Sequence, residues 1–548
     1  MTTTQSALVP AAGAGRKRII ILGGGFAGVY TAQRLEKLLR RRDDVDIVLV
    51  NRENYFVFQP LLPEVISGTI GLTDVVSPLR RLLGRTEVHV REVEGIDLER
   101  KTVTLAAGFH PSAHVLCYDH LVVALGTVTD FRGLRGLAEH AFPFKNLADA
   151  LRLRNHIIRA LEEAAIETED AELRRRLLTF VVAGGGFSGV EVAAELNDLV
   201  RSALRSYRSI DPAEVRVVLV HGQKRILPEM AAPLAAFAER KLRARGVEIL
   251  LERRLEAATG QAAILKGGEI LPTATLVSTV PSFPHPLVDE LAVEKNGGRI
   301  VVDPFMRAAG RSDLWALGDC ASVPAPGGGF SPPTAQHATR QADTCAANLV
   351  ATLDGRSDLA PMRFAGLGKM GSLGKRSAVA EVLGIKLSGF IAWFIWRGIY
   401  LMKLPGWGRR VKIAAAWTLD LLLPSDLVQL RADPAPAISR LHYEPGEAVF
   451  HEGDDGDRLY ILLTGRAEVV VGDRRVAELA AGATFGEMAL VANTRRNATV
   501  RCTEAMDVLT LPKRDFGLLA AHLPGVKQSV DKVIKERTAP PPAPGSPE

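Results

Sequence analysis

Residues 18–28 read RIIILGGGFAG, an apolar run followed at once by a glycine-rich turn. The pattern predicts a buried strand, the turn, a helix, and a second strand at 46–50. Gly23 permits a tight turn, Gly25 lets the backbone approach a pyrophosphate, and Gly28 lets the helix pack closely against the strand. The helix N-terminus adds partial positive charge. A purely structural turn is the alternative, and the strand–turn–helix–strand order disfavours it.

The same arrangement recurs 161 residues later (184 − 23), where residues 180–183 read FVVA and residues 184–189 read GGGFSG. A strand-like run at 215–220 follows the intervening helix, which carries Glu191 and Glu195. Two dinucleotide cradles in one chain are what hydride transfer between a nicotinamide and a flavin requires. The duplication therefore predicts two Rossmann-type units, one for FAD and one for a nicotinamide dinucleotide.

Both units lack the acidic residue that usually follows the second strand and accepts from a ribose 2′-hydroxyl. Asn51 stands there in the first unit and His221 in the second. Asn can still accept that hydrogen bond. His221 removes a carboxylate that would repel a 2′-phosphate, and Lys224 and Arg225 are close in sequence. NADH and NADPH therefore both stay open, and weak nicotinamide binding is a further alternative.

Composition and charge set bounds on the rest of the chain. A chain of 548 residues is too long to fold around a single hydrophobic core, so three or four domains are expected. The net charge of +6 indicates a local basic patch, and no nucleic-acid-reading motif occurs, so no nucleic-acid partner is expected. The four cysteines form no CxxC pair, which favours a reducing compartment over disulfide exchange. No His/Cys cluster has metal-ligand spacing, so no metal is expected.

Three segments are expected to lack regular structure. Residues 1–17 place their positive charges after a weakly apolar stretch, the reverse of a secretory signal, and predict a disordered leader. Residues 431–437 read RADPAPA and predict a linker, and the Pro-rich residues 536–548 predict a disordered tail. No run of eighteen uncharged apolar residues exists, so we expect no spanning helix and a cytoplasmic protein.

A series of motifs links the two cradles to a known family. Residues 18–430 resemble the type II NADH:quinone oxidoreductases, single-subunit flavoenzymes of the two-dinucleotide-binding-domain superfamily. Besides the two glycine-rich turns, the matching motifs are NRENYFVFQPLLPEV (51–65), YDHLVVALG (118–126), GGGFSGVE (184–191), ALGDCA (316–321), PPTAQHATRQ (332–341) and SLGKRSAVA (372–380).

This resemblance implies an FAD site, an NAD(P)H site and a quinone acceptor. The expected FAD-binding residues are Gly23, Gly25, Phe26, Ala27, Gly28, Asn51, Arg52, Gly126, Asp319, Ala335 and Gln336. The expected NAD(P)-binding residues are Gly184, Gly186, Phe187, Ser188, Gly189, Glu191 and His221. The residues implied in catalysis are Glu191, in the first turn of its helix near the nicotinamide, and Gln336 and Lys375, beside the flavin ring.

Each implied role has a structural alternative. Glu191 could instead stabilise a helix N-terminus, and Asp319 could be a structural strand-end residue. Gln336 could be a polar residue at a helix N-terminus, and Lys375 could be a solvated surface lysine. The family's flavin-side helix often reads AQxxxQ, whereas Arg340 stands four residues after Gln336 here. Because Arg cannot accept a hydrogen bond, contacts with a quinone carbonyl are expected to be rearranged.

Residues 386–430 are rich in Trp, Leu and Ile. Helical wheels over 386–403 and 409–423 place basic and aromatic residues beside an apolar face, which is typical of an in-plane interfacial helix. The expected membrane contacts are Trp393, Trp396, Arg397 and Trp407, with Phe394, Ile391, Ile395 and Met402 on the apolar side. Helices packed on the protein or in a homodimer interface are the alternative. The family uses this region as a monotopic anchor, which implies a peripheral protein on the cytoplasmic face of the inner membrane.

The C-terminal part resembles a cyclic-nucleotide-binding domain. Short alternating strands separated by glycine turns run from 441 to 511. The implied nucleotide contacts are Phe485, Gly486, Glu487, Met488, Ala489, Arg496, Asn497 and Ala498. Glu487 would accept from the ribose 2′-hydroxyl and Arg496 would neutralise the cyclic phosphate. Asn497 leaves cAMP and cGMP both open, and a degenerate roll used only for docking is the alternative.

The expected fold class is therefore α/β, with two Rossmann-like domains, a helical membrane-anchor segment and an all-β nucleotide-binding roll with flanking helices. The expected domains are FAD-binding at 18–145 and 290–385, NAD(P)H-binding at 146–289, anchor helices at 386–430 and the roll at 438–535. The expected activity is NAD(P)H:quinone oxidoreduction, with possible tuning by a cyclic nucleotide. The alternatives are a flavin-based sensor without turnover and a sulfide:quinone oxidoreductase, which would need redox cysteines near the flavin.

Overall fold

The computed structural model describes most of the chain in two compact units. The described residues are 8–9, 16–108, 113–129, 131, 134–279, 282–420, 427–430, 439–443, 445–456, 458–488 and 495–513. One unit comprises 9–103 and 116–430, and the other comprises 1–8, 104–115 and 431–548. The predictions for residues 1–15, for the linker 431–437 and for the tail 536–548 lie outside the described residues, apart from a two-residue strand, β1 (Leu8–Val9).

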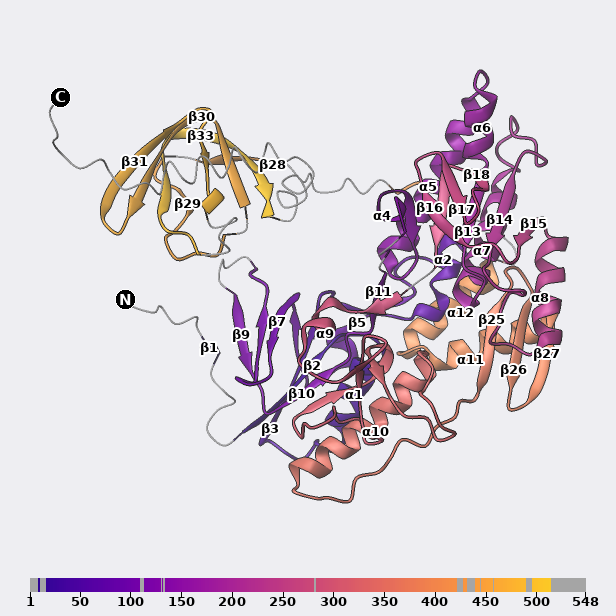
Figure 1. Ribbon diagram of the computed structural model, residues 1–548, viewed down its shortest axis with the longest axis horizontal. Coiled ribbons are helices and arrows are strands. Elements are labelled where there is room, and N and C mark those ends of the chain that lie inside the picture. Colours follow the sequence, from indigo (N-terminus) through magenta and orange to yellow (C-terminus); the bar gives the residue numbers. More distant parts are fainter. Residues whose placement is uncertain are drawn as a thin grey trace. The chain divides into compact units, whose positions relative to one another are not determined.

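The first cradle belongs to a five-stranded parallel sheet of order β23-β10-β2-β3-β6. Its strands are β2 (Lys17–Leu22), β3 (Val45–Asn51), β6 (Glu87–Val90), β10 (His120–Val123) and β23 (Leu314–Ala316). The helix α1 (Phe26–Leu38) connects β2 to β3 and packs against α10 (Ala335–Leu353) (Figure 1). The apolar side chains of β2 are fully buried at the centre of the sheet.

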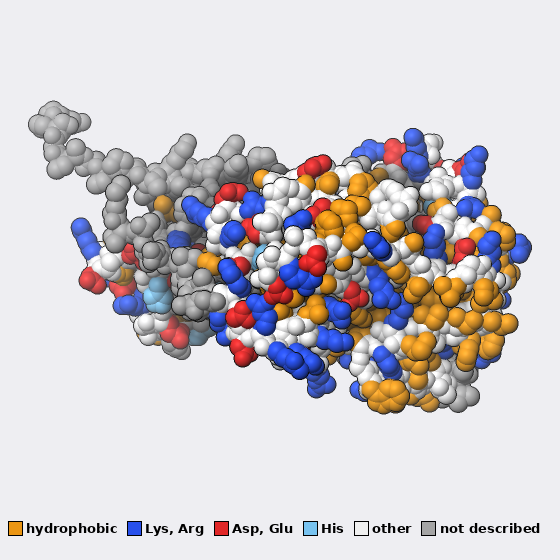
Figure 2. All heavy atoms as spheres, turned by 90° about the horizontal axis from the view of Figure 1, so that it is seen from below, with side chains coloured by type: hydrophobic (Ala, Val, Ile, Leu, Met, Phe, Trp, Pro, Cys, Tyr) orange, Lys and Arg blue, Asp and Glu red, His pale blue; other side chains and the backbone are white. Residues whose placement is uncertain are grey.

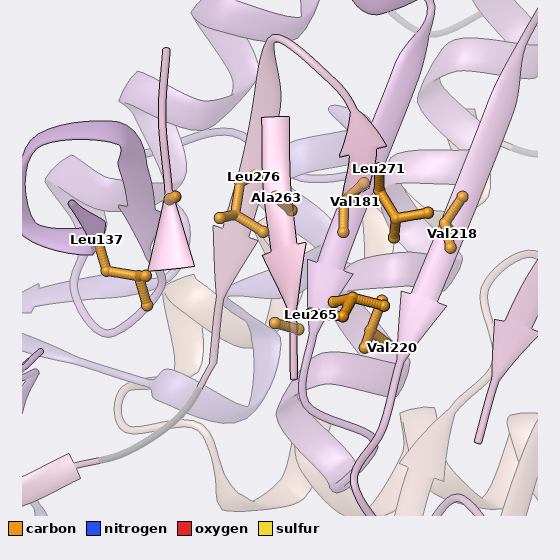
Figure 3. Close-up of a cluster of buried hydrophobic side chains, with 10 residues drawn as sticks. Leu137, Val181, Val218, Val220, Ala263, Leu265, Leu271 and Leu276 are labelled. Carbon is orange, nitrogen blue, oxygen red and sulfur yellow. The ribbon is translucent and has the colours of Figure 1, made fainter. Parts of the chain in front are cut away.

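The second cradle belongs to another five-stranded parallel sheet, of order β12-β19-β13-β14-β15. Its strands are β12 (Ala141–Pro143), β13 (Thr179–Ala183), β14 (Arg216–Val220), β15 (Val247–Leu250) and β19 (Thr275–Ser278). The helices that accompany it are α5 (Leu147–Ile166), α7 (Phe187–Ala203) and α8 (Ala232–Ala244). A small antiparallel sheet lies beside it, formed by β16 (Leu255–Ala258), β17 (Ala262–Leu265) and β18 (Ile270–Pro272). Figure 3 shows one core of this domain, in which Val181 and Val218 of the parallel sheet belong to the same buried cluster as Leu265 of β17.

A three-stranded antiparallel sheet and two helices complete this unit. The strands are β25 (Gly368–Ser372), β26 (Ala378–Val382) and β27 (Ile385–Ser388). The helices are α11 (Gly389–Lys403), which packs against β26, and α12 (Trp407–Leu419). The helix predicted from residue 386 therefore begins at Gly389, because residues 385–388 pair with β26 instead.

Three of the four predicted membrane residues face the protein interior, which corrects the prediction. Trp393, Trp396 and Arg397 are buried, whereas Trp407 is exposed. The Arg397 guanidinium lies over the rings of Trp393 and Trp417, at 4.0 Å and 4.7 Å. The helical wheel predicted an amphipathic helix, but the prediction that its aromatic and basic face contacts the membrane was wrong. That face instead covers a buried carboxylate.

The buried carboxylate is Glu64, on the short helix α2 (Pro63–Ser67) of the larger unit. Its Oε2 accepts from Trp417 Nε1 at 2.6 Å, and its Oε1 lies 3.8 Å from Arg397 Nη2. Both helices α11 and α12 are thereby tied to the nucleotide-binding core through one side chain. A buried carboxyl needs such partners, because a buried polar group left without a hydrogen bond costs about 1–3 kcal/mol.

The second unit contains an antiparallel roll. Its strands are β28 (Ser439–Tyr443), β29 (Ala448–Phe450), β30 (Arg458–Val471), β31 (Arg474–Ala480), β32 (Thr484–Phe485) and β33 (Thr499–Pro512). Leu462, Met506 and Val508 are fully buried in its core. Gly465 lies within β30, where the register with β33 shifts, and its φ is +81°. A Cβ there would lie 2.3 Å from the Ala505 carbonyl oxygen, so the strand needs a glycine at this position.

Replacing Trp417 by Phe should destabilise the larger unit by about 1–3 kcal/mol, because the buried Glu64 loses its indole donor while most of the packing is kept. Thermal unfolding of the FAD-loaded protein measures this loss. Trp407→Phe is the matched control, since that indole is exposed, and surface changes stay within about 0.5 kcal/mol. Equal melting temperatures for both variants would show that the Trp417–Glu64 bond does not hold α12 to the core.

Candidate functional site

The first glycine-rich turn has the geometry that its sequence requires. Gly23 has a φ of +105°, and a Cβ on Gly28 would lie 1.9 Å from the Gly23 carbonyl oxygen. A Cβ on Gly25, in contrast, would meet nothing within 4 Å. Gly25 is also the N-cap of α1 and has no side-chain cap. The helix N-terminus therefore opens onto free space, which fits a dinucleotide pyrophosphate.

Asn51 stands at the end of β3 and is fixed at both ends of its amide. Its Oδ1 accepts from Gly24 N at 2.7 Å and its Nδ2 donates to the Glu53 carbonyl at 2.7 Å. Arg52 is exposed and pairs with Glu53 at 3.4 Å. Phe26, at the start of α1, packs edge-on against Phe56 at 4.9 Å. Ala27 is buried beneath it.

Gly126 and Asp319 lie at the same edge of this sheet, because they follow β10 and β23. A Cβ on Gly126, which has a φ of +66°, would meet nothing within 4 Å. Ligands of open α/β sheets bind at this carboxyl edge. The structure thus gathers the expected FAD residues 23–28, Asn51, Gly126 and Asp319 at one edge.

Two further residues of this edge were not identified from the sequence. Lys145 Nζ donates to Thr127 Oγ1 at 2.7 Å and faces Asp319, and burial lowers its pKa. Gln341 is buried, and its Oε1 accepts from Gly318 N at 2.8 Å, which fixes the turn before Asp319. Gln341 ends the motif PPTAQHATRQ, but the motif alone does not show that its side chain bonds the turn before Asp319. Lys145 belongs to no motif that could have identified it.

The second turn repeats the first. Gly184 has a φ of +118°, and a Cβ on Gly189 would lie 1.7 Å from the Gly184 carbonyl oxygen. A Cβ on Gly186 would meet only Glu229 Oε1, at 3.6 Å. Ser188 is exposed on the first turn of α7. This cradle also leaves the space that a pyrophosphate needs at a helix N-terminus.

The strand β25 lies between the predicted catalytic residues Glu191 and Gln336. Ser372 N donates to Glu191 Oε1 at 2.9 Å at one end of this strand. At the other end Gln336 accepts from Leu367 N at 3.1 Å and donates to the Gly368 carbonyl at 3.1 Å. Side chains from both domains are thereby held by one strand. Phe187 also packs here, because a Cβ on Gly371 would lie 2.7 Å from its ring.

Glu191 is the fifth residue of α7, so it lies in the second turn and not in the first as predicted. Stabilisation of the helix N-terminus falls off within the first turn and does not account for it. Desolvation raises the pKa of Glu191 to about 8, and the nearby Glu195 and Glu64 add to this, while the Ser372 N–H opposes it. Glu191 is therefore protonated at neutral pH and can give up a proton near pH 8.

Lys375 and Arg340 lie apart from this pair. Lys375 follows β25, where its backbone N–H donates to Asp198 Oδ2 at 2.7 Å and its side chain is exposed. A place beside the flavin stays a prediction for Lys375. Arg340 is exposed, 3.8 Å from Asp343 and over the Phe364 ring at 5.7 Å.

The outer faces of α11 and α12 expose apolar side chains. Figure 2 shows hydrophobic side chains gathered on this unit with Lys and Arg beside them. The large exposed residues of the two helices are Phe390, Ile391, Phe394, Met402, Trp407, Val411 and Leu419. Among the described residues, every helix is too short or too polar to cross a bilayer.

In the roll, the predicted nucleotide contacts surround a buried arginine. Arg496 Nη1 donates to the Gly486 carbonyl at 2.7 Å and its Nη2 donates to the Arg458 carbonyl at 2.9 Å. Its guanidinium lies over the Phe450 ring at 4.2 Å. Phe485, Glu487 and Ala498 are buried, Met488 is half-buried and Asn497 Nδ2 contacts Met488 Sδ at 3.5 Å. Ala489 lies outside the described residues.

Comparison with known proteins identifies the family. Residues 17–342 match the pyridine nucleotide-disulphide oxidoreductase family and residues 440–522 match the cyclic nucleotide-binding domain. The chain is 33% identical over 437 residues to the type II NADH:quinone oxidoreductase NdhA of Mycobacterium tuberculosis, covering 76% of this chain and 90% of the relative. It is 34% identical over 409 residues to the demethylphylloquinone reductase NdbB of Synechocystis, covering 73% and 96%.

A solved structure shares the fold of the larger unit. NDH2 of Plasmodium falciparum in complex with NADH superposes with a TM-score of 0.70 at 18% identity, covering 75% of this chain and all of that one. The geometry of the two glycine-rich turns and of β25 is consistent with these sequence matches. The chain belongs to the type II NADH:quinone oxidoreductase family of pyridine nucleotide-disulphide oxidoreductases and carries a cyclic nucleotide-binding domain at its C-terminal end.

Proposed function

We propose that this protein oxidises NADH or NADPH through FAD and reduces a membrane quinone. The observation that carries the proposal is the strand β25, which holds Glu191 of the second cradle at one end and Gln336 beside the first at the other. The printed activities of the relatives support it. Bound FAD would supply the hydride-accepting and electron-donating chemistry.

In this proposal the residues of the chain bind and orient the two dinucleotides and supply a proton to the quinone. The backbone amides at Gly25 and Gly186 would hold the two pyrophosphates, and Asn51 fixes the first turn. Reduction of a quinone to a quinol takes up two electrons and two protons. A hydride supplies both electrons and one of the two protons, so a second proton must come from elsewhere. Desolvation raises the pKa of Glu191 to about 8, so this carboxyl holds a proton at neutral pH, and its Oε1 accepts from Ser372 N. We assign the second proton to this carboxyl.

Stopped-flow spectroscopy tests the activity. Anaerobic mixing of the FAD-loaded protein with NADH and, separately, with NADPH should bleach the flavin band with at least one donor. A short-chain quinone added next should restore the band. A flavin that neither donor reduces would support a sensor without turnover and contradict the proposal.

Glu191→Gln tests the proton role. Because the pKa of Glu191 is raised to about 8, its proton is present below that pH and lost above it. Quinone-driven reoxidation in the native protein should therefore slow above pH 8. In the variant, reoxidation should be about tenfold to a hundredfold slower at pH 7 and should lose this pH dependence, while bleaching by NADH is kept. An unchanged pH profile would remove Glu191 from proton transfer.

Sulfide:quinone chemistry is the less suitable alternative. The four cysteines are free, and Cys320, Cys345 and Cys502 are buried. Burial raises the pKa of the Cys320 thiol to about 11, so it is a poor nucleophile at neutral pH.

We propose that the exposed apolar residues of α11 and α12 rest on the cytoplasmic face of the inner membrane, with the protein bound peripherally. Phe394 and Ile391 point outward from α11, and the exposed Lys412 of α12 adds positive charge. Apolar side chains flanked by cations suit an anionic bilayer surface. A homodimer that covers the same face is the alternative.

Negative charges introduced on this apolar face should weaken membrane binding. Ile391→Glu with Phe394→Glu should lower sedimentation with vesicles of anionic phospholipid at least about tenfold, because two exposed apolar side chains that would enter the bilayer surface are replaced by negative charges. Ile166→Glu is the control, an equally exposed apolar residue on α5. Activity with a water-soluble quinone should be unchanged in both. Undiminished sedimentation of the double variant would contradict the proposal.

We also propose that the C-terminal roll binds cAMP or cGMP and tunes turnover or membrane affinity. The support is the domain match together with the buried Glu487 and Arg496 on either side of Gly486. A carboxylate for the ribose and a guanidinium for the cyclic phosphate supply complementary chemistry.

Calorimetric titration of the full chain with cAMP and with cGMP should give binding of at least one nucleotide. Glu487→Gln should weaken it about tenfold, because a charge-assisted hydrogen bond to the ribose becomes a neutral one. Asp473→Asn, in the exposed turn between β30 and β31, is the control. Absence of binding by both nucleotides would identify the roll as a docking module.

A further inference from the structure

The hairpin of β26 and β27 ends in a turn whose first residue does not suit its backbone. Val382 pairs with Ile385, so Leu383 and Gly384 alone form the turn. Both have a positive φ, of +50° and +83°, as a type I′ hairpin turn requires. Asn-Gly or Asp-Gly is the usual sequence of such a turn, because Asn and Asp tolerate a left-handed backbone and a bulky apolar residue does not.

Packing does not stabilise this leucine either. Leu383 is 79% exposed, the highest value for a large apolar side chain in the part of the chain that the structure describes. Leu227 and Met306 also have a positive φ, but both side chains are fully buried, so their packing offsets the backbone strain. Leu383 combines the strain with exposure to water. A residue that is unfavourable to the fold in both respects indicates a function outside the fold.

Two further exposed apolar side chains lie beside the turn. Ile385 is 63% exposed and Leu367 is 44% exposed. Leu383 N donates to the Leu367 carbonyl at 3.2 Å, one step beyond the strand pair Gly368–Val382, so Leu367 lies next to the turn. We call Leu367, Leu383 and Ile385 the hairpin tip.

We propose that the hairpin tip inserts into the surface of an anionic phospholipid bilayer, as a second membrane contact besides the helices α11 and α12. The charge of the surrounding sequence favours this occupant. Residues 363–412 contain ten Lys or Arg and one acidic residue, Glu381, which gives this stretch a net charge of +9 in a chain whose total is +6.

Part of this charge lies at the hairpin itself. Lys369 of β25 and Lys386 of β27 are exposed, and Glu381 of β26 stands between them in the sheet. Apolar side chains flanked by cations suit an anionic bilayer. A second copy of the chain that docked through the same surface would bring like charges together, which is unfavourable. The helix α11 packs against the same hairpin (Figure 1), so both membrane contacts belong to one structural element.

The hairpin tip lies at the end of β25 that Gln336 holds. Gln336 bonds the Leu367 N–H and the Gly368 carbonyl, so a tip in the bilayer brings this end of the strand to the membrane surface. A quinone dissolved in the bilayer could then reach Gln336 without crossing water. The contact presupposes the peripheral membrane binding proposed above and adds to it the place where the substrate enters.

The paired substitutions Leu383→Asn and Ile385→Thr test the contact, because they remove apolar surface without opposing the fold. Asn suits the first position of a type I′ turn and Thr suits a strand, so the melting temperature of the FAD-loaded protein should not fall. Sedimentation with vesicles of anionic phospholipid should weaken about tenfold to a hundredfold, because two large apolar side chains no longer leave water. Turnover with a water-soluble quinone should be unchanged, whereas turnover with a long-chain quinone embedded in the vesicles should fall. Ile270→Thr, at an exposed isoleucine of β18, is the matched control and should change none of these quantities.

A polarity-sensitive fluorophore at the turn reports insertion directly. Leu383→Cys can be labelled in a Cys117→Ser background, since the other three cysteines are buried. On addition of anionic vesicles the emission should shift to shorter wavelength, and spin-labelled lipid should quench it. The same fluorophore on Ile270→Cys should keep its aqueous emission.

The outcomes distinguish the hairpin tip from the rest of the proposed function. Full sedimentation of the double variant, together with an aqueous fluorophore at residue 383, would overturn insertion of the tip and leave binding through α11 and α12 intact. Failure of the native protein to sediment with the vesicles would overturn the peripheral membrane binding as well. A native dimer in vesicle-free solution that the double variant converts to a monomer would assign the tip to an interface between two copies of the chain and overturn its insertion.

Discussion

The fold depends on two places where backbone touches backbone and no side chain fits. In each cradle the last glycine of the turn, Gly28 or Gly189, packs against the carbonyl oxygen of the first glycine. The contact is so close that a Cβ would lie 1.9 Å or 1.7 Å from that oxygen. This contact fixes the angle between strand and helix. It also aims the helix N-terminus at the open space beside Gly25 or Gly186. Both nucleotide sites follow from that one steric condition.

A second constraint is the group of buried carboxyls where the two domains meet the helices α11 and α12. Glu64, Glu191 and Glu195 come from different parts of the chain, and burial raises the pKa of each. Arg397 and Trp417 partner Glu64, and Ser67 bonds Glu195. Such a group is stable only with its partners in place. The helices α11 and α12 therefore pack on Glu64, one member of the same group of buried carboxyls that lies near β25.

Much of the site could be predicted from sequence because its requirements are local. The glycine spacing, the apolar runs before each turn and the residues at the strand ends lie within about thirty residues of one another in each βαβ unit. Asn51 and His221 were placed correctly at the strand ends, and both bond the turn glycine. The position of Glu191 was misjudged by one turn, because α7 begins at Phe187 rather than after Gly189.

The sequence by itself determined the two cradles, the second module and the amphipathic character of α11, since each is encoded in short-range spacing. Only the tertiary structure decided which face of α11 is buried, because burial depends on Glu64, more than three hundred residues away in the chain. It also decided that Lys145 faces Asp319 and that Arg254 lies along Gly222. The contacts that a residue makes across the fold are not encoded in the sequence pattern around it. Packing and electrostatics could therefore be known only from the tertiary structure.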